Sequence, residues 1–269
     1  MDLQLEGKRA IVTGASRGIG LAAAGRLAAE GADVVIAART AEDLAAAAKS
    51  IANGGGRVLP IAVDTTNDAS VRALVDQTVQ QLGGVDILVN AAASAGVGTR
   101  LPLERKLLAD TTDEDFWSDV NTKVVGYLRT ARAVAPHLIA QRWGRIINVS
   151  GLGARQTHSI VGTVRNVGVA ALTKNLADEL GPYGINATVV HPGATLTERV
   201  DAALTSHAQL EGIDRAELER RLAERASIGR IVTSAEVANV IAFLSSPLSV
   251  AITGDAIPVG GGQRGVVHY

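Results

Sequence analysis

The chain contains no cysteine, which excludes two classes of site. Without thiols it forms neither disulfides nor thiolate metal centres. Its five histidines show no spacing typical of metal ligands, so we expect no bound metal ion. Tyrosine is scarce as well, with Tyr127, Tyr183 and Tyr269 the only examples. Four residues after the first two stand Ala131 and Ala187, so no tyrosine has a lysine at that spacing.

A strong net charge is also missing. The 26 basic and 27 acidic residues leave a formal charge of −1, which argues against nucleic-acid or acidic-membrane partners. No apolar run approaches the roughly 20 residues that cross a bilayer. Residues 1–6 lack the basic and apolar parts of a signal peptide. We therefore expect a cytoplasmic protein whose partners are small molecules.

Apolar residues are abundant, at 47% of the chain, which is enough for a substantial core. Short apolar runs alternate with longer helical patterns. The strand candidates are Ala10–Val12, Val34–Ala38, Val58–Val63, Ile87–Val89, Ile146–Val149, Ala187–Val190 and Ala256–Val259. The helix candidates are Ile19–Glu30, Ala41–Ala52, Ala69–Leu82, Glu114–Ala140, Val167–Leu180 and Ala235–Leu244. This alternation predicts a single α/β domain over residues 1–269, a doubly wound parallel sheet of about seven strands with helices on both faces.

One segment departs from the alternating pattern. Residues 196–227 are polar, charged and interrupted, unlike the apolar runs on either side. We expect this segment to form a small helical lid above the sheet.

A glycine-rich loop follows the first predicted strand, and a helix follows the loop. The glycines of Gly14-x-x-x-Gly18-x-Gly20 let the backbone turn tightly and approach a pyrophosphate. The helix N-terminus offers unpaired N–H groups to an anion. This strand–loop–helix context predicts a Rossmann-type dinucleotide site, with a purely structural turn as the alternative. The candidate contacts are Gly14, Ser16, Arg17, Gly18, Ile19 and Gly20.

Two arginines indicate which dinucleotide is bound. A site for NAD usually places an acid after the second strand, but here alanine is followed by Arg39. Arg17 lies within the glycine loop and can approach the same phosphate. A guanidinium forms bidentate bonds with a phosphate, so the pair favours NADP over NAD. The alternative is that both are solvated surface arginines.

Several motifs in a fixed order resemble the short-chain dehydrogenase/reductase family over essentially the whole chain. The glycine loop matches the family's own loop, and Ile252–Gly261 resembles its closing segment. The resemblance implies further cofactor contacts at Asp64, Asn90, Ala92, Pro192, Gly193 and Thr197. It also implies a homo-oligomer, a tetramer with two-fold axes, for which the two long apolar helices offer faces.

The same resemblance implies a catalytic serine, tyrosine, lysine and asparagine. Residues 144–150 resemble the strand before the serine, which aligns with Ser150 or with Gly151. Asn121 lies where the family has its helix asparagine; bracing a kinked helix is its alternative role. Counting back from Gly168–Ala177 puts Gly162 and Asn166 at the positions of the tyrosine and lysine. One-residue and two-residue slips do not restore the pair.

The remaining candidates for proton transfer are Ser150, Asn121 and His158. A histidine titrates near neutrality and can replace a phenol as the acid, although an exposed loop histidine is the plainer interpretation. We predict an NADP(H)-dependent oxidoreductase with a degenerate catalytic centre, acting on a small carbonyl, enone or imine. The alternatives are a nucleotide-binding regulatory protein, and a non-redox lyase or isomerase on the same fold.

Overall fold

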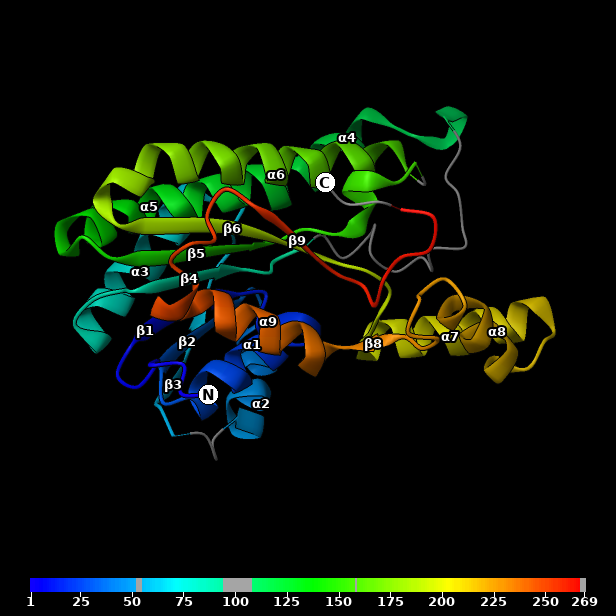
Figure 1. Ribbon diagram of the computed structural model, residues 1–269, viewed down its shortest axis with the longest axis horizontal. Helices are drawn as coiled ribbons and strands as arrows, with labels where there is room; N and C mark the ends of the chain where they lie inside the picture. The colour runs from blue at the N-terminus through cyan, green and yellow to red at the C-terminus, as the bar shows by residue number, and fades with distance from the viewer. Residues whose placement is uncertain (52–54, 94–107, 158, 267–269) are drawn as a thin grey trace.

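A seven-stranded sheet forms the centre of the computed structural model, which describes residues 1–51, 55–93, 108–157 and 159–266 (Figure 1). The strand order is β3-β2-β1-β4-β5-β6-β9, and every pairing is parallel. Their bounds are β1 Arg9–Thr13, β2 Asp33–Ala38, β3 Val58–Ala62, β4 Ile87–Asn90, β5 Gly144–Val149, β6 Ile185–Pro192 and β9 Ala256–Val259. The predicted fold class is confirmed, because each apolar run forms one of these parallel strands.

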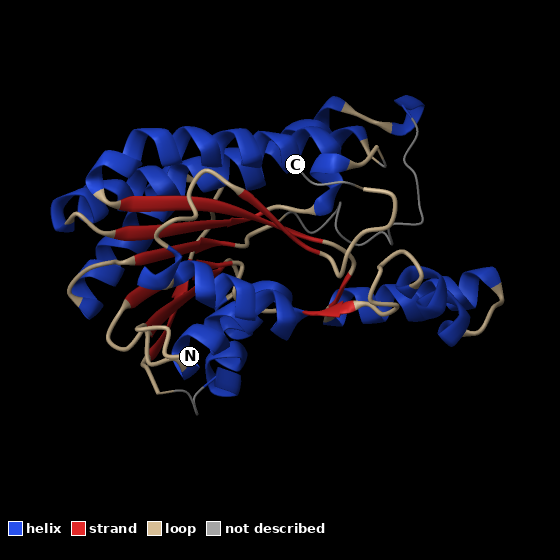
Figure 2. Cartoon of the chain, in the orientation of Figure 1, coloured by secondary structure: helices blue, strands red, loops and turns tan. Residues whose placement is uncertain are grey.

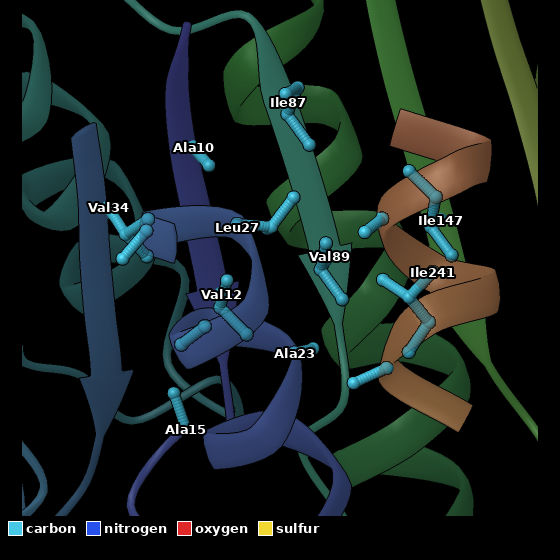
Figure 3. Close-up of a cluster of buried hydrophobic side chains, with 14 of the residues drawn as sticks. Ala10, Val12, Ala15, Ala23, Leu27, Val34, Ile87, Val89, Ile147 and Ile241 are labelled. Atoms are coloured by element: carbon cyan, nitrogen blue, oxygen red, sulfur yellow. The ribbon is translucent and has the colours of Figure 1, made fainter. Parts of the chain in front are cut away.

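Helices cover both faces of the sheet, as Figure 2 shows. One face carries α1 (Gly18–Ala29), α2 (Ala41–Ile51) and α9 (Ser234–Ser245). The opposite face carries α3 (Asp68–Leu82), α4 (Asp113–Val120), α5 (Gly126–Gln141) and α6 (Ile160–Leu180). Leu27 of α1 and Ile241 of α9 are fully buried against the strands (Figure 3). Burial on both faces explains why the strands read as continuous apolar runs.

A helix covers the predicted stretch Glu114–Ala140, but it is not α-helical throughout. A π-helical segment over Asn121–Val125 separates α4 from α5. The Arg129 side chain donates hydrogen bonds to the carbonyl and side-chain oxygens of Asn121, at 3.4 and 2.9 Å. These bonds satisfy acceptors where the regular helical ladder is interrupted. Such π segments rotate the following side chains and occur often at functional sites.

The next helix begins earlier than predicted, at Ile160 instead of Val167. The Ser159 hydroxyl accepts a hydrogen bond from the Gly162 backbone N–H at 3.1 Å and so caps the helix. The earlier start places both Gly162 and Asn166 inside α6.

A helical arm, residues 198–223, projects beside the sheet (Figure 1). It consists of α7 (Glu198–Glu211) and α8 (Arg215–Ala223) around a small core of Leu204, Leu218 and Leu222. The short parallel strands β7 (Thr195–Leu196) and β8 (Val232–Thr233) join the arm to the domain. Among the described residues, no helix is both long and apolar enough to cross a membrane.

Candidate functional site

One cavity of about 600 Å³ opens at the carboxyl ends of the central strands. The strand order reverses between β1 and β4, and such switch points are where open α/β sheets bind ligands. The cavity wall runs from the glycine loop, past the ends of β2 and β3, to the end of β5 and the π-helical segment. The first turn of the helical arm closes one side, through residues 197–200.

The glycine loop has backbone geometry that other residues do not reproduce. Gly14 and Gly18 have positive φ angles of 68° and 59°. A Cβ atom on Gly14 would lie 2.7 Å from the Ala91 backbone, and one on Gly20 would lie 2.3 Å from the Gly14 carbonyl oxygen. Ser16 and Ile19 complete this part of the wall. The loop therefore packs tightly, with the first turn of α1 facing the cavity.

The N-terminus of α1 already binds a carboxylate. Its N-cap residue, Arg17, provides no side-chain cap, and the first turn contains no acidic residue. The Gly18 backbone N–H donates to Glu198 Oε2 of the arm at 3.1 Å. Backbone N–H groups that bind one anion can bind another. The N-terminus of α1 is therefore compatible with a pyrophosphate.

Three arginines line the same end of the cavity, Arg17, Arg39 and Arg199. Burial, together with the charge of Arg17, lowers the pKa of Arg199 from its usual value. Asp64 also lines the wall; hydrogen bonds from Thr66 lower the pKa of its carboxyl, with a smaller contribution from Arg39. The wall is thus rich in guanidinium groups, and Arg199 is a member that the sequence patterns did not indicate.

The remaining predicted cofactor residues divide into three groups. Ala92 and Thr197 lie on the cavity wall. Asn90 is fully buried behind it, accepting a hydrogen bond from Thr130 at 2.8 Å. Pro192 ends β6 and Gly193 follows it, both outside the wall, and the Gly193 backbone N–H donates to the Val259 carbonyl oxygen at 3.1 Å.

At the other end of the cavity, the structure brings Ser150 and Asn121 onto one wall. The Ser150 hydroxyl lies 3.1 Å from the Asn166 carbonyl oxygen and 3.2 Å from its side-chain oxygen, to which it donates. The Asn121 side-chain oxygen accepts from Arg129, as described above. His158, the third predicted catalytic residue, lies outside the described residues.

The side chain of Asn166, a residue of α6, packs against the loop after β5. It is buried, and Cβ atoms on Gly151 and Gly153 would lie 3.3 and 3.0 Å from its side-chain nitrogen. Gly162 is buried one helical turn earlier. The described residues that line the cavity include no tyrosine.

Lys123 is a wall residue that the sequence patterns did not indicate. It lies in the middle of the π-helical segment, and its side chain is buried, with 5% of the residue exposed. Its ammonium nitrogen donates to the Ser150 carbonyl oxygen at 3.0 Å. The sequence offered one sign of a buried lysine, its position beside the apolar Val124 and Val125. A lysine within a helical pattern usually faces solvent, however, so this sign was weak.

Two charged side chains act on this lysine. Arg165 of α6 pairs with Asp119 of α4 at 2.6 Å, and Asp119 is fully buried. Burial first, then the charge of Arg165, lowers the pKa of Lys123 well below its usual value, while Asp119 opposes the shift. Tyr127 is also buried, and its hydroxyl donates to the Val149 carbonyl oxygen at 2.9 Å. Burial raises the pKa of Tyr127, so this phenol is a structural group beneath the site.

No group of three potential metal ligands among His, Cys, Asp and Glu occurs in the part of the chain that the structure describes. The cavity therefore combines an anion-binding loop, arginines and a buried lysine beside a serine. This arrangement can hold a phosphorylated ligand at one end and donate hydrogen bonds or a proton at the other.

Known proteins match the chain over nearly its full length. A family model described as enoyl-(acyl carrier protein) reductase matches residues 14–264. The short-chain reductase protein NovJ of Streptomyces niveus is 35% identical over 94% of this chain and 93% of its own. The 3-oxoacyl-[acyl-carrier-protein] reductase FabG of Aquifex aeolicus is 32% identical over 98% of this chain and 100% of its own.

Solved structures agree with these relatives. L-sorbose reductase from Gluconobacter frateurii, crystallised with NADPH and L-sorbose, superposes with a TM-score of 0.91 at 31% identity, covering 99% of this chain and 100% of its own. A single-residue variant of actinorhodin polyketide ketoreductase with NADPH gives 0.87 at 31% identity, covering 96% and 98%. Sequence, fold and site geometry lead to one conclusion: the chain belongs to the short-chain dehydrogenase/reductase family.

Proposed function

We propose that the protein is an NADP(H)-dependent oxidoreductase that reduces a small carbonyl, enone or imine without a Tyr-x-x-x-Lys pair. The observation that carries this proposal is the continuity of the cavity. One wall joins the arginines at the glycine loop to Ser150 and Lys123 at the end of β5. A cofactor bound along it would reach from the anion site to the polar groups where a substrate is held.

The cofactor end supplies binding and selectivity. The Gly14–Gly20 loop and the N-terminus of α1 suit the pyrophosphate. The Glu198 carboxylate bonded to the Gly18 N–H is evidence that this N-terminus binds anions. Arg17 and Arg39 suit a 2′-phosphate, and Arg199 adds a third guanidinium. When bound, NADPH supplies the hydride, so the chain itself must hold the substrate and handle the proton.

The reaction end supports a modified route for the proton. By the family resemblance, Gly162 and Asn166 of α6 stand at the positions of the tyrosine and the lysine, so at these two positions α6 offers neither a phenol nor an ammonium. Ser150 and Asn121 offer polar side chains on the wall. The reductase activity of the relatives supports redox chemistry here by analogy.

A cofactor-consumption assay tests the proposal. NADPH binding is measured by fluorescence, and NADPH oxidation is then followed with ethyl acetoacetate, 2-cyclohexen-1-one and 1-pyrroline as probes for the three substrate classes. We expect binding, and oxidation with at least one probe. Tight NADPH binding without oxidation of any probe would favour the regulatory alternative, and absence of binding would refute both.

A further inference from the structure

Lys123 is the buried cation of the cavity that the family resemblance does not account for. An ammonium has three hydrogen-bond donors. Among the described residues its one hydrogen-bond acceptor is the Ser150 carbonyl oxygen, at 3.0 Å. The side chain also forms part of the cavity wall. Donors therefore remain available to a molecule in the cavity.

A purely structural role explains this lysine poorly. Removing an ammonium from water is costly unless a carboxylate compensates it. The carboxylate that acts on it, Asp119, is already paired with Arg165 at 2.6 Å. A neutral hydrogen-bond donor would be enough to link the π-helical segment to the Ser150 carbonyl oxygen after β5. The cost of burying this charge is better explained by a ligand that uses it.

Lys123 and Asn166 both form hydrogen bonds with Ser150, through different atoms of the serine. The ammonium of Lys123 contacts the Ser150 carbonyl oxygen, and Asn166 accepts from the Ser150 hydroxyl. Asn166 takes the α6 position at which the family resemblance expects a lysine, whereas Lys123 projects from the segment between α4 and α5. The site therefore retains an ammonium, but a different helix supplies it.

We propose that Lys123 is the catalytic acid of this site, a role that rests on the proposed reductase function. During reduction, hydride adds to the carbonyl carbon and the π electrons of the C=O bond move to oxygen. The Lys123 ammonium gives one proton to that oxygen, an alcohol forms, and the lysine is left as a neutral amine. A proton from solvent then restores the ammonium. For an imine, the nitrogen takes the place of the oxygen.

The surroundings of Lys123 support proton release. Arg165 from α6 disfavours the charged form, and Asp119 from α4 partly offsets it. Tyr127 from α5 bonds to backbone oxygens and offers no charge. On β6, His191 is buried and accepts from the Gly151 backbone N–H at 3.3 Å. An amine whose pKa is lowered is a stronger acid than one exposed to solvent.

Three variants separate the proton from the charge. Lys123→Met removes both, Lys123→Arg keeps the charge but holds its proton too tightly, and Lys174→Met changes an exposed lysine paired with Asp178. With whichever probe the wild type reduces, we expect kcat to fall about 10²-fold or more in both Lys123 variants, as loss of an acid does. Lys174→Met should match the wild type. Fluorescence should show unchanged NADPH affinity in Lys123→Met.

Two pH profiles complete the test. The wild-type reduction rate should fall as pH rises through the pKa of Lys123, and this limb should vanish in Lys123→Arg. Without substrate, the lowered pKa means that the charged lysine weakens the folded state below that pKa, and this cost disappears as pH approaches the unfolded value. The melting temperature of the wild type, relative to Lys123→Met, should therefore rise with pH.

The outcomes distinguish the two proposals. Wild-type rates in Lys123→Met or Lys123→Arg would overturn the acid role and leave the reductase function standing. A melting-temperature difference that does not change with pH would also overturn it, because the lysine would not titrate as required. NADPH binding without turnover by the wild type would overturn the reductase function, and the acid role with it.

Discussion

At the scale of single residues, charge at the cavity wall decides which dinucleotide is preferred. Arg39 follows β2 at the place where an acid would select NAD, and Arg17 lies on the same wall. No carboxylate forms an ion pair with either arginine within the described chain. Both guanidinium groups can therefore turn to a phosphate.

We predict that NADPH binds at least tenfold more tightly than NADH, a difference of about 1.4 kcal/mol, within reach of one charge-assisted contact. Arg39→Ala should weaken NADPH binding while leaving NADH binding nearly unchanged. Calorimetry of both cofactors measures this, with Arg72→Ala as the control because Arg72 is exposed on α3 and paired with Asp68. Equal affinities in the wild type would contradict the assignment of these arginines.

A second set of residues fixes the sheet behind the cavity. Asn148 on β5 accepts a hydrogen bond from Asn90 on β4 at 2.9 Å and donates one to Thr173 on α6 at 2.9 Å. Thr130 on α5 donates to Asn90 at 2.8 Å. All four are buried, so each polar group depends on the others.

We predict that Asn148→Ala destabilises the fold by about 1–3 kcal/mol for each buried group left unsatisfied, beginning with the Asn90 amide. Urea unfolding monitored by circular dichroism measures the change. Asn175→Ala, at an exposed position of α6, serves as the matched control and should shift the midpoint little. If the two variants unfold alike, the bonds through Asn148 contribute little to stability.

At the scale of elements, the first turn of α7 meets the first turn of α1. The Glu198 carboxylate accepts from the Gly18 backbone N–H, where the helix dipole also favours negative charge. A pyrophosphate at the same N-terminus would compete with this carboxylate and be repelled by it. The helical arm and the cofactor therefore use the same backbone donor.

We predict that Glu198→Gln tightens NADPH binding about two- to fivefold, because a charge near a helix N-terminus is worth about 0.3–1 kcal/mol. Fluorescence titration measures the dissociation constant. Glu211→Gln, at the far end of α7, should leave it unchanged. Weaker binding in Glu198→Gln would mean that the carboxylate supports the bound cofactor.

The same elements explain what the sequence could and could not predict. Apolar runs bounded by turns located every strand of the large sheet, because burial on both faces leaves a strong local signal. The π-helical segment at Asn121–Val125 left no such signal, since its residues belong to the same helical pattern as those around it. Lys123 was missed because the same pattern gave no sign that its side chain is buried and bonded to the Ser150 carbonyl oxygen.

At the scale of the whole molecule, α4, α5 and α6 form the layer seen at the top of Figure 1. Several large apolar side chains of this layer remain exposed in the single chain. Trp117 is 66% exposed, Val164 46% and Val167 47%. Val164 and Val167 are three residues apart on α6 and so share a helix face. Exposed apolar groups gathered in one layer are typical of an interface between subunits.

We predict that the protein is a homo-oligomer, a tetramer with two-fold axes, in which this layer is buried. Sedimentation at micromolar concentration should give a mass well above the 27.7 kDa of one chain. The double variant Val164→Glu and Val167→Glu should dissociate it, because four copies of two carboxylates would then enter apolar contacts. Leu210→Glu, on the helical arm, changes an equally apolar side chain that is 82% exposed and should leave the mass unchanged. A wild type that sediments only as a single chain would end the prediction, and dissociation by Leu210→Glu alone would move the interface to the arm.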